Sequence, residues 1–236
     1  MKLDILAFGA HPDDVELGCS GTLAKMVRQG KKVGIIDLTR GELGSRGNEK
    51  IRTKEAKKAS EILGIHYRNN LDLGDGFFEV NKKNIKEVIK EIRRCRPSTI
   101  LANAPKDRHP DHGKGADLIL KANYLSGLVK IKTSVNDHDQ SPHRASHIFH
   151  YIQDFYIEPD FCIDIGDFVQ IKEKAIQAFA SQFYDPNNLE KETPISKASF
   201  MQHIKGRALQ FGRYIQKDFA EGFLSAQPFE LKELPL

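Results

Sequence analysis

The sequence predicts an α/β protein built as three layers, with a mostly parallel sheet covered by helices on both faces. In the first hundred residues, short apolar runs of strand length alternate with segments that have helical periodicity. This alternation is typical of βαβ units, and right-handed crossovers place helices on both faces of such a sheet. The 236 residues, 39% of them hydrophobic, suffice for a substantial core, and we expect a single domain over residues 1–236.

The first half of the chain contains four strand-like runs separated by helices. The runs are apolar and short, the third being more polar than the others, and they cover Leu3–Ala10, Val33–Thr39, His66–Leu73 and Thr99–Ala104. Apolar residues at helical spacing predict helices over Gly21–Gly30, Ile51–Leu63, Ile85–Ile92 and Asp111–Tyr124. Gly30 and Gly64 are suited to end two of these helices, and Pro97 ends the third.

The second half is less regular. Residues 127–146 are polar and without a clear period, which predicts either a functional loop or a mobile connection. Two further strands are expected at 148–152 and 161–165, followed by helices that begin near 167 and near 196. We find no internal repeat and no linker-like stretch that would divide the chain.

Composition excludes several classes of function. The net charge is only +4, with 36 basic and 32 acidic residues, which argues against a strongly basic nucleic-acid-binding arm. A mean hydropathy of -0.47, with no apolar run of spanning length, argues against a membrane protein. Three cysteines without a CxxC pattern, and no export signal, predict a cytoplasmic protein in a reducing compartment.

Two short histidine-carboxylate clusters follow predicted parallel strands. His11-Pro-Asp-Asp14 comes directly after the first strand, and His109-Pro-Asp-His112 comes a few residues after the strand at 99–104. Ligands bind at the carboxyl ends of strands in open α/β sheets, so the two clusters can meet in space. A single His-Pro-Asp sequence is usually an ordinary turn, and this interpretation remains the alternative for each cluster.

Two histidines and a carboxylate suit a divalent metal ion with an open coordination position. We predict His11, Asp14 and His112 as ligands, because residues three apart on a tight turn or first helical turn point the same way. Zinc fits this set, and non-haem Fe²⁺ is also compatible. Asp13 would then face a water molecule and accept its proton.

The remaining residues of the second cluster are candidates for assisting the reaction. His109 is free to act from the opposite side, as an imidazolium, on an oxyanion or a leaving amine. Asp111 is predicted to orient the imidazole of His109, as carboxylates commonly do next to metal sites.

The two clusters and several other segments resemble one known family. Ala-His-Pro-Asp-Asp at 10–14, followed about a hundred residues later by His-Pro-Asp-His at 109–112, resembles the LmbE-like (PIG-L) family of zinc-dependent N-acetylglucosamine deacetylases. The resemblance extends over most of the chain and includes Thr39–Gly47, Arg52–Ala56 and Leu71–Gly76.

This resemblance implies a Rossmann-like fold and one catalytic zinc. The family's ligands match His11, Asp14 and His112, its general base matches Asp13, and its transition-state histidine matches His109. Within the family the sequence most resembles deacetylases of bacillithiol biosynthesis, which act on N-acetylglucosaminyl-malate. Members that act on chitin fragments, the mycothiol precursor, or lipid-linked or antibiotic sugars share the motif, and a metal- or sugar-binding module without turnover also remains open. The resemblance also implies a homo-oligomer, commonly a hexamer.

Four arginines and one glutamate near the strand-end loops are candidates for binding the substrate. Arg40, Arg46, Arg52 and Arg108 suit an anionic sugar conjugate, because a guanidinium binds a carboxylate through two hydrogen bonds. Surface arginines are the alternative for each. Glu42 would either bind sugar hydroxyls or brace Arg46. We expect a small-molecule substrate, with no nucleic acid or membrane as partner.

Overall fold

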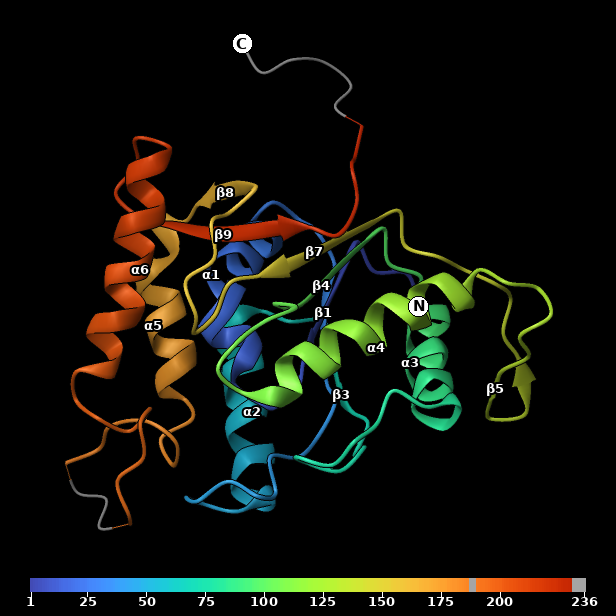
Figure 1. Cartoon of the computed structure of the whole chain (residues 1–236), viewed down its shortest axis with the longest axis horizontal. Helices are drawn as coiled ribbons and strands as arrows, with labels where there is room; N and C mark the ends of the chain where they lie inside the picture. Colours follow the sequence, from blue (N-terminus) through green and yellow to red (C-terminus); the bar gives the residue numbers. More distant parts are fainter. Residues whose placement is uncertain (187–189, 231–236) are drawn as a thin grey trace.

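A computed structural model describes residues 1–186 and 190–230 of the chain. Its centre is a seven-stranded sheet with the order β3-β2-β1-β4-β7-β9-β8 (Figure 1). The strands are β1 Ile5–Gly9, β2 Val33–Asp37, β3 Tyr67–Asn70, β4 Thr99–Asn103, β7 His147–Tyr151, β8 Phe161–Asp164 and β9 Ala220–Ser225. Neighbouring strands from β3 to β7 are parallel, whereas β9 is antiparallel to both β7 and β8. The predicted α/β class with a mostly parallel sheet is confirmed.

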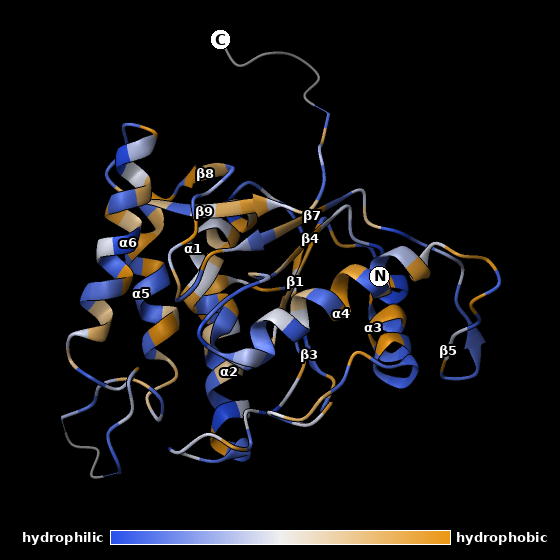
Figure 2. Cartoon of the chain, in the orientation of Figure 1, coloured by the Kyte–Doolittle hydropathy of each residue, from blue (hydrophilic) through white to orange (hydrophobic). Residues whose placement is uncertain are grey.

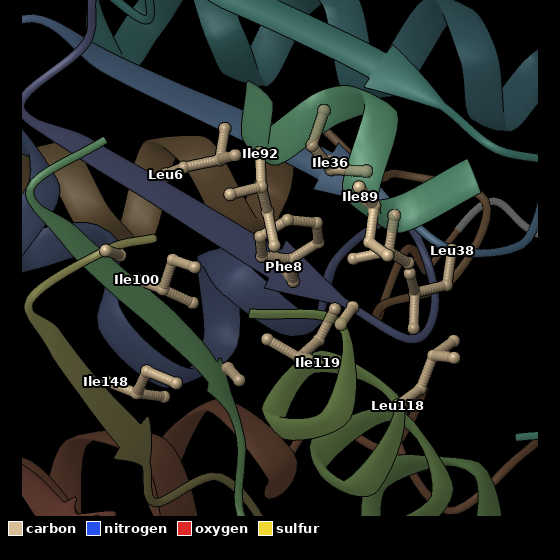
Figure 3. Close-up of a cluster of buried hydrophobic side chains, with 14 of the residues drawn as sticks. Leu6, Phe8, Ile36, Leu38, Ile89, Ile92, Ile100, Leu118, Ile119 and Ile148 are labelled. Atoms are coloured by element: carbon tan, nitrogen blue, oxygen red, sulfur yellow. The ribbon is translucent and has the colours of Figure 1, made fainter. Parts of the chain in front are cut away.

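Helices cover both faces of this sheet (Figure 1). Their bounds are α1 Asp14–Arg28, α2 Glu49–Leu63, α3 Lys82–Cys95, α4 Pro110–Ser126, α5 Val169–Gln177 and α6 Phe200–Tyr214. One face packs against α3 and α4, where Leu6 and Phe8 of β1 meet Ile92 of α3 and Ile119 of α4 (Figure 3). Burial of these aliphatic and aromatic side chains is the main force that holds the layer together.

The opposite face packs against α1, with α2 and α5 further out, while α6 packs directly against β9 and β8. Because side chains alternate along a strand, Ala7 of β1 points away from Leu6 and Phe8 and meets Val15 and Leu23 of α1. Hydropathy follows the layers, since the central strands are largely apolar and the outer turns of α2 and α6 carry hydrophilic residues (Figure 2). This arrangement leaves the carboxyl ends of β1 and β4 side by side.

Strand β9 and the early start of α1 were not predicted from the sequence. The antiparallel strand β9 fills an interior position between β7 and β8. Helix α1 begins at Asp14 and has a non-helical residue, Cys19, within it. Just after this break, the carboxylate of Glu221 on β9 accepts hydrogen bonds from the backbone N–H groups of Gly21 (3.0 Å) and Thr22 (2.7 Å). The last strand is thereby bound to the helix that begins at the first histidine-carboxylate cluster.

The polar segment 127–146 is held away from the carboxyl ends of β1 and β4. It contains a short hairpin of β5 (Ser134–Val135) and β6 (His138–Asp139) beside α3 (Figure 1). Arg93 of α3 donates hydrogen bonds to the carbonyl oxygens of Leu128 (3.0 Å) and Ile131 (2.7 Å). The buried guanidinium therefore fixes this connection to the helix.

No helix in the described part of the chain is long and apolar enough to span a membrane.

Candidate functional site

The two histidine-carboxylate clusters meet at the carboxyl ends of β1 and β4. These strands are neighbours in the sheet, so the turn after β1 and the loop after β4 lie next to each other. The ring centroids of His11 and His109 are 4.5 Å apart, those of His109 and His112 are 5.4 Å apart, and those of His11 and His112 are 5.7 Å apart. The expected meeting of the clusters is therefore observed.

The three predicted ligands lie next to one another, although the donor groups that lie within 4.8 Å of one another combine other residues of the cluster. Asp14 lies between the histidines, with its Oδ1 3.2 Å from Nε2 of His112 and its Oδ2 3.5 Å from Nδ1 of His11. Ligand atoms about 2.0–2.1 Å from a tetrahedral zinc ion are about 3.3 Å apart. Both distances are near this value, but they involve different oxygens of Asp14, so the assignment of these three residues as ligands stays a prediction. Hydrogen bonds from Gln153 Nε2 (2.8 Å) and Asn103 Nδ2 (3.1 Å) fix the carboxylate of Asp14.

Two groups of donor atoms in the cluster lie close enough to share an ion. Those of His11, His109 and His112 form one such group, and those of His11, Asp75 and Asp111 form another, each group lying within 4.8 Å. Nε2 of His11 is buried without a hydrogen-bond partner, although Asp75 Oδ1 is 3.0 Å away. An unsatisfied buried nitrogen is costly, which supports a cation-binding role for this cluster.

The charges of the predicted ligands are strongly coupled. Burial opposes ionisation of Asp14, but His112 and His11 outweigh it and hold the pKa of Asp14 well below its usual range. Burial likewise opposes protonation of His112, yet Asp14 and Asp107 raise its pKa to about 9. Metal binding must therefore displace protons from this site.

Asp13 has the environment of a general base. Its side chain is buried, and burial raises its pKa to about 7 against the opposing charge of Arg52. Nη2 of Arg52 lies 3.0 Å from Asp13 Oδ2, and it also donates to the carbonyl oxygen of Pro12. The backbone of Asp13 has a φ of 119°, in a region that favours glycine. The turn therefore holds this aspartate in a strained backbone conformation.

His109 is oriented by the backbone rather than by the carboxylate of Asp111. Its Nδ1 accepts a hydrogen bond from the N–H of Asp111 (3.3 Å), so a neutral imidazole carries its proton on Nε2. Burial, together with His11 and His112, lowers the pKa of His109, which favours the neutral ring over the expected imidazolium. The neutral ring can still donate a hydrogen bond from Nε2.

The prediction that the Asp111 carboxylate orients His109 is wrong. Asp111 Oδ2 accepts a hydrogen bond from the N–H of Gly76 (2.8 Å) and lies 3.5 Å from His11 Nε2, while Oδ1 is 2.8 Å from Lys114 Nζ. The first turn of α4 directs the carboxylate toward the loop after β3. Asp111 thus contacts the first cluster instead of its sequence neighbour.

Two of the five residues predicted to bind substrate line the pocket that contains the cluster. The pocket has a volume of about 510 Å³, and Arg52 and Arg108 lie on its wall. Arg40 instead pairs at the surface with Glu49 (2.9 Å) and Asp72 (2.8 Å).

Arg46 and Glu42 are likewise engaged outside the pocket wall. Arg46 donates to the carbonyl oxygen of Phe183 (3.4 Å), and Glu42 accepts from the N–H groups of Asp75 (2.7 Å) and Arg40 (3.1 Å). The structure therefore does not bring Arg40, Arg46 and Glu42 to the pocket wall, and their predicted contacts with substrate stay a prediction.

Four further residues of the site were not predicted from the sequence. Three of them follow the carboxyl ends of strands, where ligands bind in open α/β sheets: Asp75 after β3, Asp107 after β4 and Gln153 after β7. The sequence could therefore have indicated them. Arg207 lies in the middle of α6 and lines the same pocket. Nothing in its local sequence distinguishes it from the other basic residues of that helix.

Asp107 holds the outer nitrogen of His112, and this contact leads to a prediction for Asp107→Asn. The Oδ2 of Asp107 accepts a hydrogen bond from His112 Nδ1 (2.7 Å), and its Oδ1 accepts one from the N–H of Phe155 (2.7 Å). An amide side chain has a single acceptor oxygen and cannot satisfy both donors. We expect metal affinity to fall about 10–100-fold in this variant, measured by competition with a chelator.

Asp154→Asn is the matched control for this measurement. Asp154 pairs with Arg108 on the pocket wall, and no hydrogen bond or ion pair among the described residues joins its carboxylate to His112. Its metal affinity should equal that of the wild type. A metal affinity of Asp107→Asn within twofold of the wild type would contradict the assigned role of Asp107.

Comparison with known proteins identifies the family. The family model described as "PIG-L: GlcNAc-PI de-N-acetylase" matches residues 6–123, the half of the chain that contains both clusters. A diacetylchitobiose deacetylase from Thermococcus kodakarensis is 28% identical over 229 residues, which cover 92% of this chain and 81% of that protein.

Two solved structures share the fold over nearly the whole chain. The conserved protein TT1542 from Thermus thermophilus is 35% identical, with a TM-score of 0.85 and 97% of each chain covered. A 4-carboxy-2-hydroxymuconate hydratase from Pseudomonas putida has a TM-score of 0.78 with each chain covered fully, but at 22% identity this likeness shows the fold alone. With its family match over half its length and both clusters inside that match, the chain belongs to the PIG-L family.

Proposed function

We propose that the protein is a metal-dependent N-deacetylase that hydrolyses the acetamide group of an N-acetylglucosamine conjugate. The observation that carries this proposal is the position of Asp13. It is a buried carboxylate next to the predicted ligands His11 and Asp14, yet the ligand set is complete without it. A binding module has no need of such a base, whereas hydrolysis by an activated water requires one.

We propose zinc as the metal, held by His11, Asp14 and His112. Two nitrogens and one carboxylate leave a coordination position open, and the same donor set suits Fe²⁺. A divalent cation in this position supplies Lewis acidity, which favours deprotonation of water and withdraws electrons from an acyl carbonyl.

The side chains around the cation divide the proton transfers of amide hydrolysis. Asp13 accepts the proton of the attacking water. His109 Nε2–H donates a hydrogen bond to the carbonyl oxygen as that oxygen becomes negative. The protonated Asp13 then gives this proton to the departing nitrogen, because a neutral His109 has no acidic proton to donate, so that the products are acetate and a free amine.

For the substrate we propose N-acetylglucosaminyl-malate, the intermediate of bacillithiol biosynthesis. Three guanidinium groups on the pocket wall, those of Arg52, Arg108 and Arg207, support an anionic conjugate, although Asp13 and Asp154 pair with the first two. A chitooligosaccharide is the second candidate, favoured by the similarity to the Thermococcus diacetylchitobiose deacetylase.

A substrate panel tests the proposal. The purified protein is loaded with zinc or Fe²⁺, and acetate release is measured from N-acetylglucosaminyl-malate and from N,N'-diacetylchitobiose. Faster turnover of the malate conjugate supports the first substrate, and faster turnover of chitobiose supports the second. Binding of either sugar without acetate release, with either metal, would contradict deacetylation and indicate a binding module.

A further inference from the structure

The pocket has two walls that come from different parts of the chain. Strand-end residues such as His11, Asp13 and His112 form one wall, which lies inside the matched family region. Helix α6, beyond that region, forms the facing wall with Phe200, Ile204 and Arg207 among others. The wall of strand-end residues can therefore hold the reacting amide, while α6 contacts the far end of the substrate.

Three arginines line this pocket, and they differ in how their charge is balanced. Arg52 is paired with Asp13, and Arg108 is paired with Asp154. Arg207 forms no ion pair within 4.0 Å with any carboxylate in the described ranges, 1–186 and 190–230, and burial lowers its pKa although Asp154 and Asp107 act on its charge from further away. Its Nη2 donates to the backbone carbonyl oxygen of Asp154, and its Nη1 is buried without a hydrogen-bond partner.

An unpaired, partly buried guanidinium is unfavourable in the empty pocket. Arginine keeps its charge at any physiological pH, so it cannot relieve the cost of burial by losing a proton. Ile204 and Phe200 place apolar atoms on the same wall and limit the compensation that water can provide. The carboxylates of Asp154 and Asp107 lie too far to form an ion pair with Arg207, so its Nη1 is open to an anion from a ligand, and the planar fork of arginine fits a carboxylate.

We propose that Arg207 binds a carboxylate on the aglycone of the substrate and makes α6 the wall that selects anionic conjugates. Arg108 is less suited to this role, because its charge is already balanced by Asp154 on the same side of the pocket. The inference rests on the proposed deacetylase function, since it assigns the part of the pocket that receives the group beyond the sugar.

Replacement of Arg207 by glutamine tests the inference with two substrates. In Arg207→Gln we expect KM for N-acetylglucosaminyl-malate to rise about tenfold or more, because a charge-assisted bidentate contact is lost. The KM for N,N'-diacetylchitobiose, which has no charge, should stay within twofold. Arg207→Lys keeps the charge without the fork and should give an intermediate KM for the malate conjugate.

Arg213→Gln is the matched control, since Arg213 is an exposed arginine near the end of the same helix. It should leave both KM values unchanged, and thermal denaturation of all variants checks that they are folded. An equal change of KM for both substrates in Arg207→Gln, or no change for either, would overturn the inference.

Calorimetric titration with N-acetylglucosaminyl-malate separates this inference from the proposed function. If the wild type binds the conjugate but releases no acetate from any sugar, deacetylation is refuted. Loss of that binding in Arg207→Gln but not in Arg213→Gln would still support the carboxylate contact. Equal binding by both variants would refute it.

Discussion

Replacing Asp13 by asparagine is expected to lower kcat about 10²–10⁴-fold while the metal content stays at the wild-type level. The substitution keeps the size of the side chain but removes the carboxylate that we propose as the acceptor of the proton of water. Asp13 contacts Arg52, and the proposed ligands His11, Asp14 and His112 are unchanged in the variant. Acetate release and elemental analysis of the same preparation measure the two quantities together.

The control for this experiment is Asp117→Asn, an exposed position on α4. It makes the same chemical change away from the pocket and should leave kcat and metal content unchanged. Full activity in Asp13→Asn would refute its role as the base, whereas loss of metal from that variant would show that Asp13 acts on the ligand set.

The environment of Asp13 also determines how kcat/KM should change with pH. Burial raises its pKa to about 7 in the metal-free protein, and a bound cation would favour the carboxylate and lower this value. A base must be deprotonated, so kcat/KM should be high above the pKa and fall as the pH drops through it. The acidic limb should therefore lie at or below about pH 7 and should flatten in Asp13→Asn.

Replacing His112 by alanine is expected to remove the metal and, with it, measurable acetate release. His112 supplies Nε2 next to Asp14, and its outer nitrogen is fixed by Asp107, so the loss should exceed the roughly 10–100-fold effect of changing a residue behind the ligand. Because Asp14 and Asp107 raise its pKa to about 9, protons compete with the metal for this nitrogen. Metal affinity of the wild type should thus increase as the pH rises toward that value.

Equilibrium dialysis against zinc, followed by elemental analysis, measures this effect. His138→Ala on the exposed hairpin strand β6 is the matched control and should bind as much metal as the wild type. Retention of one metal ion per chain by His112→Ala at micromolar zinc would refute the ligand assignment and favour the neighbouring donor group of His11, Asp75 and Asp111.

The sequence predicts the site residues that follow the carboxyl ends of parallel strands. His11 and His112 are brought together because parallel strands β1 and β4 are adjacent and end at the same edge of the sheet. That rule depends only on the order of strands and helices, which apolar periodicity reveals. The same rule applied to β3 and β7 would have added Asp75 and Gln153.

The direction of a side chain within a loop could not be predicted in the same way. Arg40 and Arg52 both lie near the strand-end loops, yet Arg40 pairs at the surface while Arg52 reaches the buried carboxylate of Asp13. Local backbone angles and the nearest carboxylate decide this outcome. Arg207 was beyond prediction because the wall that it faces is formed by residues far earlier in the chain, such as His112 and Asp13.

The interior position of β9 has a consequence for biosynthesis. Its Glu221 binds the backbone of Gly21 across 200 residues of sequence, a separation that slows folding. At about 5–20 residues per second, roughly 3–14 s pass on the ribosome between synthesis of β7 and of β9. During that interval β7 is an open edge, the state in which a nascent chain is most exposed to aggregation.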